Sequence, residues 1–262
     1  MGLGYGLLLP FVLYILLALQ AKAVYYPVRE YSGSTFFDGW DFYGNVDNTT
    51  WGEQSQQSMR IYTLICKTGN VTYVNQTTAV SQGLAYVNSA GNAIMKVDNT
   101  TTIAPAPLVN RNSIRITSQD TYGAGNLILV DVKHIPYGCS VWPSFWTLGT
   151  GLWPNGGEID IIEAINLMSN DQYALHTIGG CTLNTTGAQL TGTVYGTDCS
   201  TGSGCVIAET KPNSYGAGFA AAGGGVWATQ LDVTGIYMWF WSVSHCFRFW
   251  FGRGTDASRS LA

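Results

Sequence analysis

The chain has 262 residues, of which only 11% are charged, and its formal net charge is −4 at pH 7. No stretch concentrates Lys and Arg, so the sequence excludes the basic surface that nucleic acid requires, and no nucleic-acid partner is expected. Glycine (32), tyrosine (15) and tryptophan (9) are abundant. This uncharged, aromatic composition suits one large β domain, or two small ones, that meets a neutral polysaccharide.

The N-terminal segment carries an apolar run from Leu7 to Leu19, followed by the cleavage pattern Ala21-Lys22-Ala23. We interpret residues 1–23 as a signal peptide and residues 24–262 as the secreted, extracellular domain. A retained membrane anchor is the alternative, but the run is slightly shorter than the ~20 residues that span a bilayer and contains Pro10. No stable membrane association is therefore expected.

Asn-x-Ser/Thr sequons favour the same secretory route. The five sequons lie at Asn48, Asn70, Asn75, Asn99 and Asn184. The sequence therefore predicts a glycoprotein.

Two segments differ in character from their surroundings. Residues 53–69 separate Trp51-Gly52 from Asn70-Val71, two stretches that otherwise run together smoothly. Residues 243–262 begin with the basic aromatic stretch Val243–Arg248. We hypothesise that both segments are translated introns or errors in the coding sequence.

Short strands, separated by turn-rich Gly, Asn, Thr and Ser stretches, are predicted along the mature chain, with no long amphipathic helix. The clearest are Ser113–Thr117, Gly125–Lys133, Val141–Leu148, Glu158–Glu163, Tyr173–Thr177, Val226–Val233 and Ile236–Trp241. This pattern is typical of an all-β sandwich. The glycines 223–225 precede a strand rather than a helix, which argues against a phosphate-binding loop.

The cysteines indicate an oxidising compartment. Cys66 and Cys246 fall inside the two unusual segments. The others form an even set that predicts two disulfides, and four cysteines allow three pairings. This set is Cys139, Cys181, Cys199 and Cys205. A third bridge between Cys66 and Cys246 is the alternative if both segments are genuine.

Acidic residues concentrate in Glu158-Ile159-Asp160-Ile161-Ile162-Glu163, which holds three of the 16 in the chain. The isoleucines favour a strand on which Glu158 and Asp160 project from one face, and a β-bulge at Ile161-Ile162 would return Glu163 to that face. The Cα atoms of the two glutamates would then lie about 13 Å apart at about 3.3 Å per residue. Retaining cleavage of a glycosidic bond requires two carboxyl groups about 5–5.5 Å apart, so the two side chains would lean together. A solvated acidic strand face without chemistry is the alternative.

Three tryptophans, Trp142, Trp146 and Trp153, lie just upstream of the acidic strand. Flat aromatic rings hold the apolar faces of sugars, so the cluster indicates sugar subsites. The alternative is that Trp142 and Trp146 belong to the core of a sandwich, since aromatic residues are heavily buried on average.

Together these patterns resemble glycoside hydrolase family 16, and in particular the secreted fungal laminarinase-like endo-1,3(4)-β-glucanases. The likeness covers most of residues 27–242. It rests on the motifs Tyr31-Ser32-Gly33, Phe36-Phe37-Asp38-Gly39-Trp40-Asp41-Phe42, Arg111-Asn112-Ser113-Ile114-Arg115, Trp142-Pro143-Ser144-Phe145-Trp146, Gly156-Gly157 with Glu158–Glu163, Leu175-His176-Thr177, and Gly223-Gly224-Gly225-Val226-Trp227. Because the family normally continues for several more segments, the resemblance implies a C-terminal truncation.

The resemblance implies an all-β, concanavalin A-like jelly roll of two sheets, whose concave sheet forms a cleft for β-glucan. Position by position, it implies that Glu158 is the nucleophile, Glu163 the acid/base and Asp160 a modulator of the pair. The residues that it places in the substrate-binding cleft are Trp142, Trp146, Trp153 and His176. For His176 a core or surface histidine is the alternative. The resemblance implies no organic cofactor, the sequence locates no metal site, and a monomer is expected.

The expected activity is hydrolysis of 1,3- or mixed 1,3/1,4-linked β-glucan by a retaining double displacement. The acidic motif is one residue longer than in the related bacterial lichenases. This longer spacing resembles that of the laminarinases and favours activity on 1,3-linkages. One alternative is a transglycosylase that passes the glycosyl unit to another sugar on cell-wall glucan. The other is a non-catalytic glucan-binding protein, against which the three close carboxylates argue.

Overall fold

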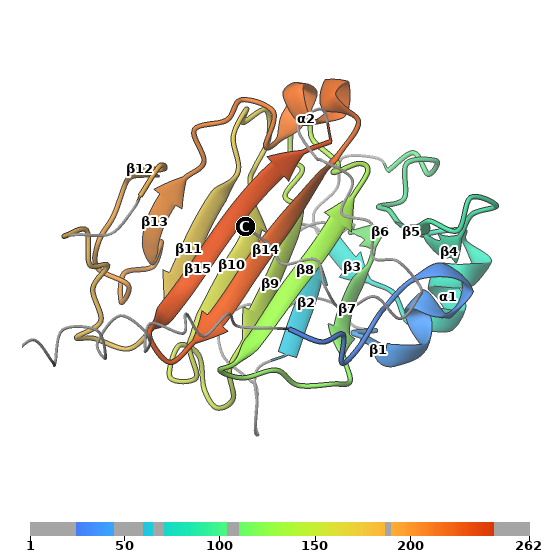
Figure 1. The fold of residues 1–262 in the computed structure, drawn as a ribbon. Coiled ribbons are helices and arrows are strands. Elements are labelled where there is room, and N and C mark those ends of the chain that lie inside the picture. Colours follow the sequence, from blue (N-terminus) through green and yellow to red (C-terminus); the bar gives the residue numbers. More distant parts are fainter. Residues whose placement is uncertain (1–24, 45–59, 65–70, 104–109, 187–189, 244–262) are drawn as a thin grey trace, which may run out of the picture. The chain divides into compact units, whose positions relative to one another are not determined.

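The computed structural model describes residues 25–44, 60–64, 71–103, 110–186 and 190–243, with the backbone alone for 60–64. Its helices and strands all belong to the unit that spans Arg29–Trp250 (Figure 1). The strands are β1 (Trp40–Phe42), β2 (Arg60–Leu64), β3 (Val71–Tyr73), β4 (Ala85–Val87), β5 (Ala93–Met95), β6 (Arg111–Ser113), β7 (Arg115–Ser118), β8 (Asn126–Val132), β9 (Ser144–Leu148), β10 (Glu158–Glu163), β11 (Gln172–His176), β12 (Thr193–Val194), β13 (Cys205–Ala208), β14 (Gly225–Asp232) and β15 (Gly235–Ser242). The helices are the 3-10 helix η1 (Gly33–Gly39), α1 (Gln76–Ser81) and α2 (Gly216–Ala222).

Eight strands form the larger sheet, in the order β1-β7-β2-β9-β10-β11-β13-β12. The acidic strand β10 lies between β9 and β11 and pairs antiparallel with both. Strand β2 pairs on either side with β7 and β9. Its residues 60–64 fall inside segment 53–69, whose origin as a translated intron stays a prediction.

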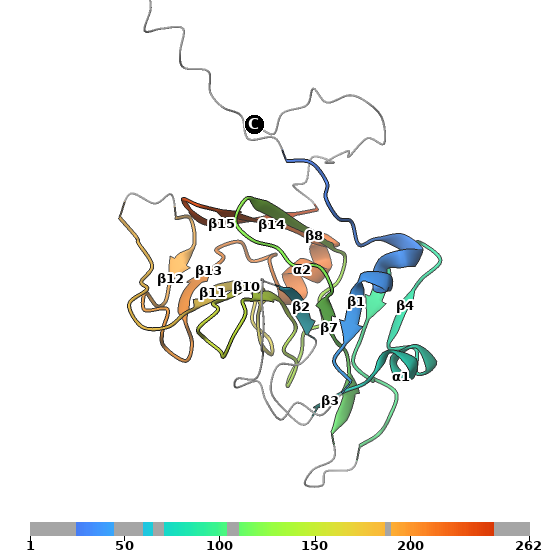
Figure 2. The same ribbon diagram turned by 90° about the horizontal axis from the view of Figure 1, so that it is seen from below.

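Three further strands form a second sheet, in the order β15-β14-β8. Figure 2 shows this sheet and the β10-β11 region of the larger sheet as two layers. In the hairpin β14–β15 the Asp232 carboxylate accepts hydrogen bonds from the main-chain N–H and hydroxyl of Thr234 at the turn. Two antiparallel layers around a shared core are the sandwich that the sequence predicts.

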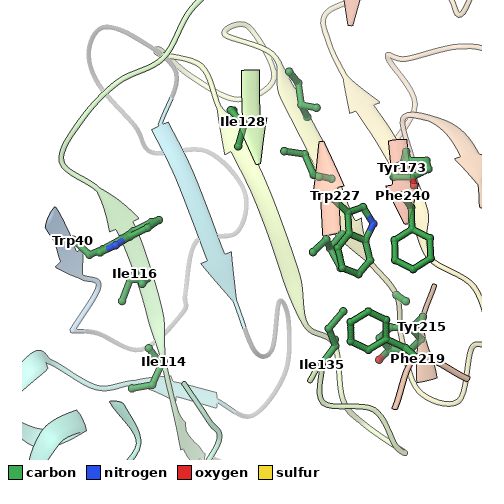
Figure 3. Packing of buried hydrophobic residues seen from close by; sticks show 14 of the residues in the cluster. Trp40, Ile114, Ile116, Ile128, Ile135, Tyr173, Tyr215, Phe219, Trp227 and Phe240 are labelled. Atoms are coloured by element: carbon green, nitrogen blue, oxygen red, sulfur yellow. The ribbon is translucent and has the colours of Figure 1, made fainter. Parts of the chain in front are cut away.

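The main core lies between these two layers. Figure 3 shows Trp227 of β14 beside Phe240 of β15, and their ring centroids are 4.6 Å apart. Tyr173 of β11 and Ile159 and Ile161 of β10 belong to the same buried cluster. Full burial of such an aliphatic side chain stabilises the fold by about 1.5–3 kcal/mol. The isoleucines therefore hold β10 with its acidic residues on the opposite face.

A second, smaller cluster packs on that opposite face. Strand β3 pairs in parallel with β6, and its Val71 and Tyr73 pack against Trp146 and Leu148 of β9. Tyr43 and Trp153 are partly buried against this cluster, and its packing buries Trp146.

Most predicted strands are confirmed, and β10 has the predicted bounds Glu158–Glu163. The predicted strand Ser113–Thr117 is divided at Ile114 between β6 and β7. The short helices were not predicted. Helix α1 starts where Asn75 accepts a hydrogen bond from the Thr78 N–H at 2.9 Å, and α2 ends at Gly223, whose φ of +80° is the left-handed conformation that favours glycine.

The prediction of two disulfides among the four cysteines is half right. Cys199 and Cys205 are bonded, whereas Cys139 and Cys181 are free, exposed thiols. Cys139 precedes β9, and Cys181 follows β11. Since both strands are antiparallel to β10, these positions lie beyond opposite ends of the sheet. The five-residue strands separate them by roughly 16 Å at about 3.3 Å per residue, too far for a bridge.

Several predictions lie outside the described residues. These are the signal peptide of residues 1–23, the sequons at Asn48 and Asn70, the cysteines Cys66 and Cys246, and all of residues 53–69 and 243–262 except 60–64 and 243. Within the described ranges, no helix is long and apolar enough to cross a membrane.

Candidate active site

The three acidic side chains of β10 lie on the face of the larger sheet that points away from the main core. Glu158 pairs with Leu148 and His176, and Asp160 pairs with Trp146 and Ala174. Directly opposed residues of antiparallel strands share a face, so these neighbours surround the acids. Asp160 is fully buried, while Glu163 is only partly buried.

The predicted bulge is confirmed. Against β9, Asp160 pairs with Trp146 and Ile162 with Phe145, so Ile161 is the extra residue. The pairing with β11 shifts over the same stretch. The bulge keeps Ile161 and Ile162 in the core and returns Glu163 to the face of Glu158 and Asp160.

Glu158 is held by the loop between β9 and β10. Its Oε2 accepts a hydrogen bond from Trp153 Nε1 at 2.5 Å. The loop closes where Gly149 and Gly156 touch backbone to backbone, an approach that a Cβ on either residue would block. This glycine contact brings Trp153 back over the acidic strand.

Glu163 is held by the segment before β9. Its Oε1 accepts a hydrogen bond from Trp142 Nε1 at 2.9 Å. Upstream, the Ser140 N–H donates to Asn166 Oδ1 at 2.8 Å, and both residues have positive φ, 61° and 55°. Such strained conformations persist only where surrounding contacts fix them. Here the Ser140–Asn166 hydrogen bond fixes the backbone two residues before Trp142, the tryptophan that binds Glu163.

Asp160 contacts His176 at the middle of the acidic face. His176 Nε2 lies 3.2 Å from Asp160 Oδ2, and both side chains are buried. The Trp153 ring lies 5.6 Å from the His176 ring, measured between centroids. The structure therefore brings together the acidic trio, Trp142, Trp153 and His176.

Trp146 lies on the same face but offers little surface. Its side chain is 4% exposed, packed by the second cluster. The Arg115 guanidinium lies 5.4 Å from the Trp146 ring centroid and 4.6 Å from that of Tyr43. Trp146 thus forms part of the floor beside Asp160, and its role in substrate binding stays a prediction.

Asp171, which sequence reasoning missed, also contacts the site. It immediately precedes β11, and its Oδ1 accepts a hydrogen bond from the Glu163 main-chain N–H at 2.9 Å. Burial is the main cause that raises the pKa of Asp171 well above its ordinary value, although three N–H donors oppose the rise. The only sequence feature that could have linked Asp171 to the site is its position five residues before His176. An isolated Asp outside a strand pattern does not predict burial.

No group of three or more His, Cys, Asp or Glu side chains is placed to hold a metal ion among the residues that the structure describes. The arrangement offers instead two glutamates on one face, each bound by an indole N–H, with a buried aspartate between them. Such a pair serves as nucleophile and proton donor at a glycosidic bond.

The fold and the site are those of a jelly-roll glycoside hydrolase, a class of protein in which a two-sheet sandwich carries the catalytic carboxyl groups on one face of a sheet. The model of the XgeA-like catalytic GH16 domain matches residues 66–246. The chain belongs to glycoside hydrolase family 16, as its sequence motifs indicate.

Fungal proteins are similar to this chain over most of its length. A probable glycosidase of Schizosaccharomyces pombe is 37% identical over 223 residues, which are 83% of this chain and 47% of that protein. A probable endo-1,3(4)-β-glucanase of Aspergillus fumigatus is 36% identical over 233 residues, 87% of this chain and 32% of that protein. The chain thus spans about half the length of the first relative and about a third of the second.

Solved structures of the same family share the fold. An elongating family 16 β-1,3-glucosyltransferase superposes with a TM-score of 0.69 at 36% identity, covering 82% of this chain and 66% of that chain. Laminarinase 16A of Phanerochaete chrysosporium, with 6-O-glucosyl-laminaritriose in its donor and acceptor sites, gives a TM-score of 0.68 at 33% identity and the same coverages. These neighbours confirm the predicted jelly roll.

Proposed function

We propose that the protein is a secreted endo-β-glucanase that hydrolyses 1,3- or mixed 1,3/1,4-linked β-glucan with retention of configuration. The observation that carries the proposal is the common face of Glu158 and Glu163, each with an indole donor on one carboxyl oxygen. The names of the relatives and the laminari-oligosaccharide bound by one structural neighbour support the substrate class.

In the proposed mechanism Glu158 attacks the anomeric carbon, while Glu163 protonates the leaving oxygen through its carboxyl group. The Trp153 N–H orients the Glu158 carboxylate, and the Trp142 N–H occupies Glu163 Oε1. Glu163 then removes a proton from the water that cleaves the glycosyl-enzyme ester. Asp160, buried against His176 between the two, adds negative charge that favours the positive charge developing on the sugar ring.

The test is release of reducing ends from laminarin and from mixed-linkage β-glucan, with Glu163→Ala as the control. We expect activity in the parent protein and its loss in the control. A folded parent protein that binds laminarin but releases no reducing ends would contradict the proposal and favour a glucan-binding protein.

Transglycosylation is the second candidate, because the structural neighbour with a TM-score of 0.69 is named an elongating glucosyltransferase. The same glycosyl-enzyme ester then passes to a sugar hydroxyl rather than to water. Mass spectrometry of the products from laminarihexaose separates the two outcomes. Products longer than the substrate indicate transfer, and only shorter products indicate hydrolysis.

Secretion as a glycosylated monomer is part of the proposal. The sequons at Asn75, Asn99 and Asn184 all lie at exposed positions, where a transferase can reach them. Expression through a secretory pathway, followed by enzymatic removal of N-glycans, should lower the apparent mass. Light scattering of the product should give the mass of one chain.

A further inference from the structure

Asp171 connects the two sheets at the position of Glu163. It is fully buried. Its Oδ1 accepts from the Glu163 main-chain N–H and its Oδ2 from Trp227 Nε1, both at 2.9 Å. Its own N–H donates to Ser214 Oγ at 2.9 Å. One side chain thus joins the end of the acidic strand to the opposite sheet.

The β-bulge explains why this contact matters. An extra residue interrupts the hydrogen-bond ladder, and a buried main-chain N–H at such a place needs another acceptor. In β10 the register shifts between Asp160 and Glu163, and the Asp171 carboxyl group supplies the acceptor at Glu163. Without it the backbone of Glu163 would lose a fixed point in a buried environment.

The other end of the link is rigid. Trp227 is fully buried and packs between two aromatic rings, with centroids 4.6 Å from Phe240 and 5.4 Å from Phe219. Figure 3 shows Trp227, Phe240 and Tyr173 gathered between the layers. The hydrogen bond from Trp227 therefore fixes the Asp171 side chain against the core, and Asp171 in turn fixes the backbone position of Glu163.

We propose that Asp171 is a positioning residue that sets the place of the Glu163 carboxyl group by binding the Glu163 main-chain N–H. This inference rests on the proposed function, in which Glu163 is the acid/base. Trp142 fixes the Glu163 side chain at Oε1, and Asp171 fixes the backbone from which that side chain extends. A misplacement of about 1 Å at a catalytic group lowers the rate about 100-fold.

The experiment compares three variants. Asp171→Ala removes the acceptor, Asp171→Asn offers an amide oxygen in its place, and Tyr173→Phe removes a nearby buried hydroxyl that bonds Glu209 rather than Glu163. We expect Asp171→Ala to lower kcat about 100-fold with little change in KM. Asp171→Asn keeps an acceptor for the Glu163 N–H but turns its NH2 toward Trp227 Nε1–H, so it should recover only part of that loss. Tyr173→Phe should lower the melting temperature but leave kcat per folded molecule unchanged.

A leaving-group test separates positioning of the acid/base from general damage. A dinitrophenyl β-glucan oligosaccharide needs no protonation of its leaving group, and azide attacks the glycosyl-enzyme ester without a base, releasing Glu158 as a carboxylate. With this substrate and azide, Asp171→Ala should approach the parent rate. An undiminished deficit, or equal loss of kcat in Asp171→Ala and Tyr173→Phe, would overturn the proposal.

A structural readout keeps the inference apart from the proposed function. In the parent protein the Glu163 amide proton should be strongly protected from hydrogen exchange. Protection should fall in Asp171→Ala and persist in Tyr173→Phe. If the parent protein cleaves no glucan, the proposed function fails, and unchanged Glu163 protection in Asp171→Ala would separately refute the positioning contact.

Discussion

At the scale of single residues, the acidic face pairs each glutamate with one tryptophan from a neighbouring loop. Trp153 binds Glu158 and Trp142 binds Glu163. A typical hydrogen bond contributes about 0.5–1.5 kcal/mol, so each indole constrains the carboxyl group that it binds. Both tryptophans therefore contact the acidic side chains through the indole N–H, and not through the face of the ring.

The first prediction concerns Glu158. Glu158→Gln keeps the shape of the side chain but removes the nucleophile, so we expect kcat to fall at least about 10,000-fold while laminarin binding persists. Isothermal titration with laminari-oligosaccharides and reducing-end assays measure the two properties. Near-normal turnover in this variant would show that the nucleophile is another residue; the exposed Glu30→Gln serves as the control.

The second prediction concerns Gly204, which packs against His176. Its φ is +67°, and a Cβ there would overlap Leu175 O and lie 3.1 Å from the His176 ring. Gly204→Ala should therefore displace His176 from Asp160 and lower both kcat and the melting temperature. Gly202→Ala, in the same loop with open space around it, should change neither. Equal behaviour of the two variants would contradict the packing argument.

The third prediction concerns pH. Because burial raises the pKa of Asp171 in the folded state, the folded protein keeps a proton that the unfolded chain releases near pH 4. The contribution of Asp171 to stability is complete below about pH 4 and is lost as the pH rises toward its folded-state pKa. The titratable groups that interact with Asp171 are Glu163, Tyr173 and Tyr215, and the Glu209 carboxyl group lies behind Tyr173, whose hydroxyl it binds. The melting temperature of the parent protein relative to that of Asp171→Asn should fall as the pH rises above about 4, and a difference that is independent of pH would refute this.

At the scale of elements, the acidic strand β10 could be predicted from the sequence, but the buried residues and the elements that surround it could not. The β-branched isoleucines and the five-residue spacing of the glutamates give both the strand and its bulge. Asp171 and Arg115 escaped prediction because their burial depends on strands distant in sequence, β14 for Asp171 and β9 for Arg115. Helices α1 and α2 have too few turns to show an apolar period. Strand β2 does contain strand-favouring Ile, Tyr and Thr, but it was not predicted because all of residues 53–69 are interpreted as a translated intron or coding error.

The fourth prediction concerns the disulfide that closes the segment before β13. Cys199 and Cys205 are six residues apart, and a loop of this length implies a stabilisation of about 2 kcal/mol. Replacing both with Ser should lower the free energy of unfolding by about that amount in urea titrations. Replacing the free Cys139 and Cys181 should have no such effect, and a reversed order would contradict the assigned pairing.

At the scale of the whole molecule, the two-sheet jelly roll follows from the alternation of short strands and turns, and family 16 membership follows from motifs spread over the chain. The sandwich places an apolar core on one face of β10 and the acidic trio on the other. The chain spans about half of the Schizosaccharomyces pombe relative and about a third of the Aspergillus fumigatus relative. Substrate class, secretion and the fate of the glycosyl-enzyme ester are properties of the whole protein and require direct tests.

Trapping the glycosyl-enzyme ester shows directly whether Glu158 is the nucleophile of a retaining reaction. A 2-deoxy-2-fluoro-laminaribiosyl fluoride forms the ester with a good leaving group and slows its hydrolysis, so that peptide mass mapping locates the modified carboxylate. We expect a single adduct on Glu158, its absence in Glu158→Gln, and products released with retained configuration. An adduct on Asp160, Glu163 or any other residue would show that Glu158 is not the nucleophile, and products of inverted configuration would rule out a retaining reaction.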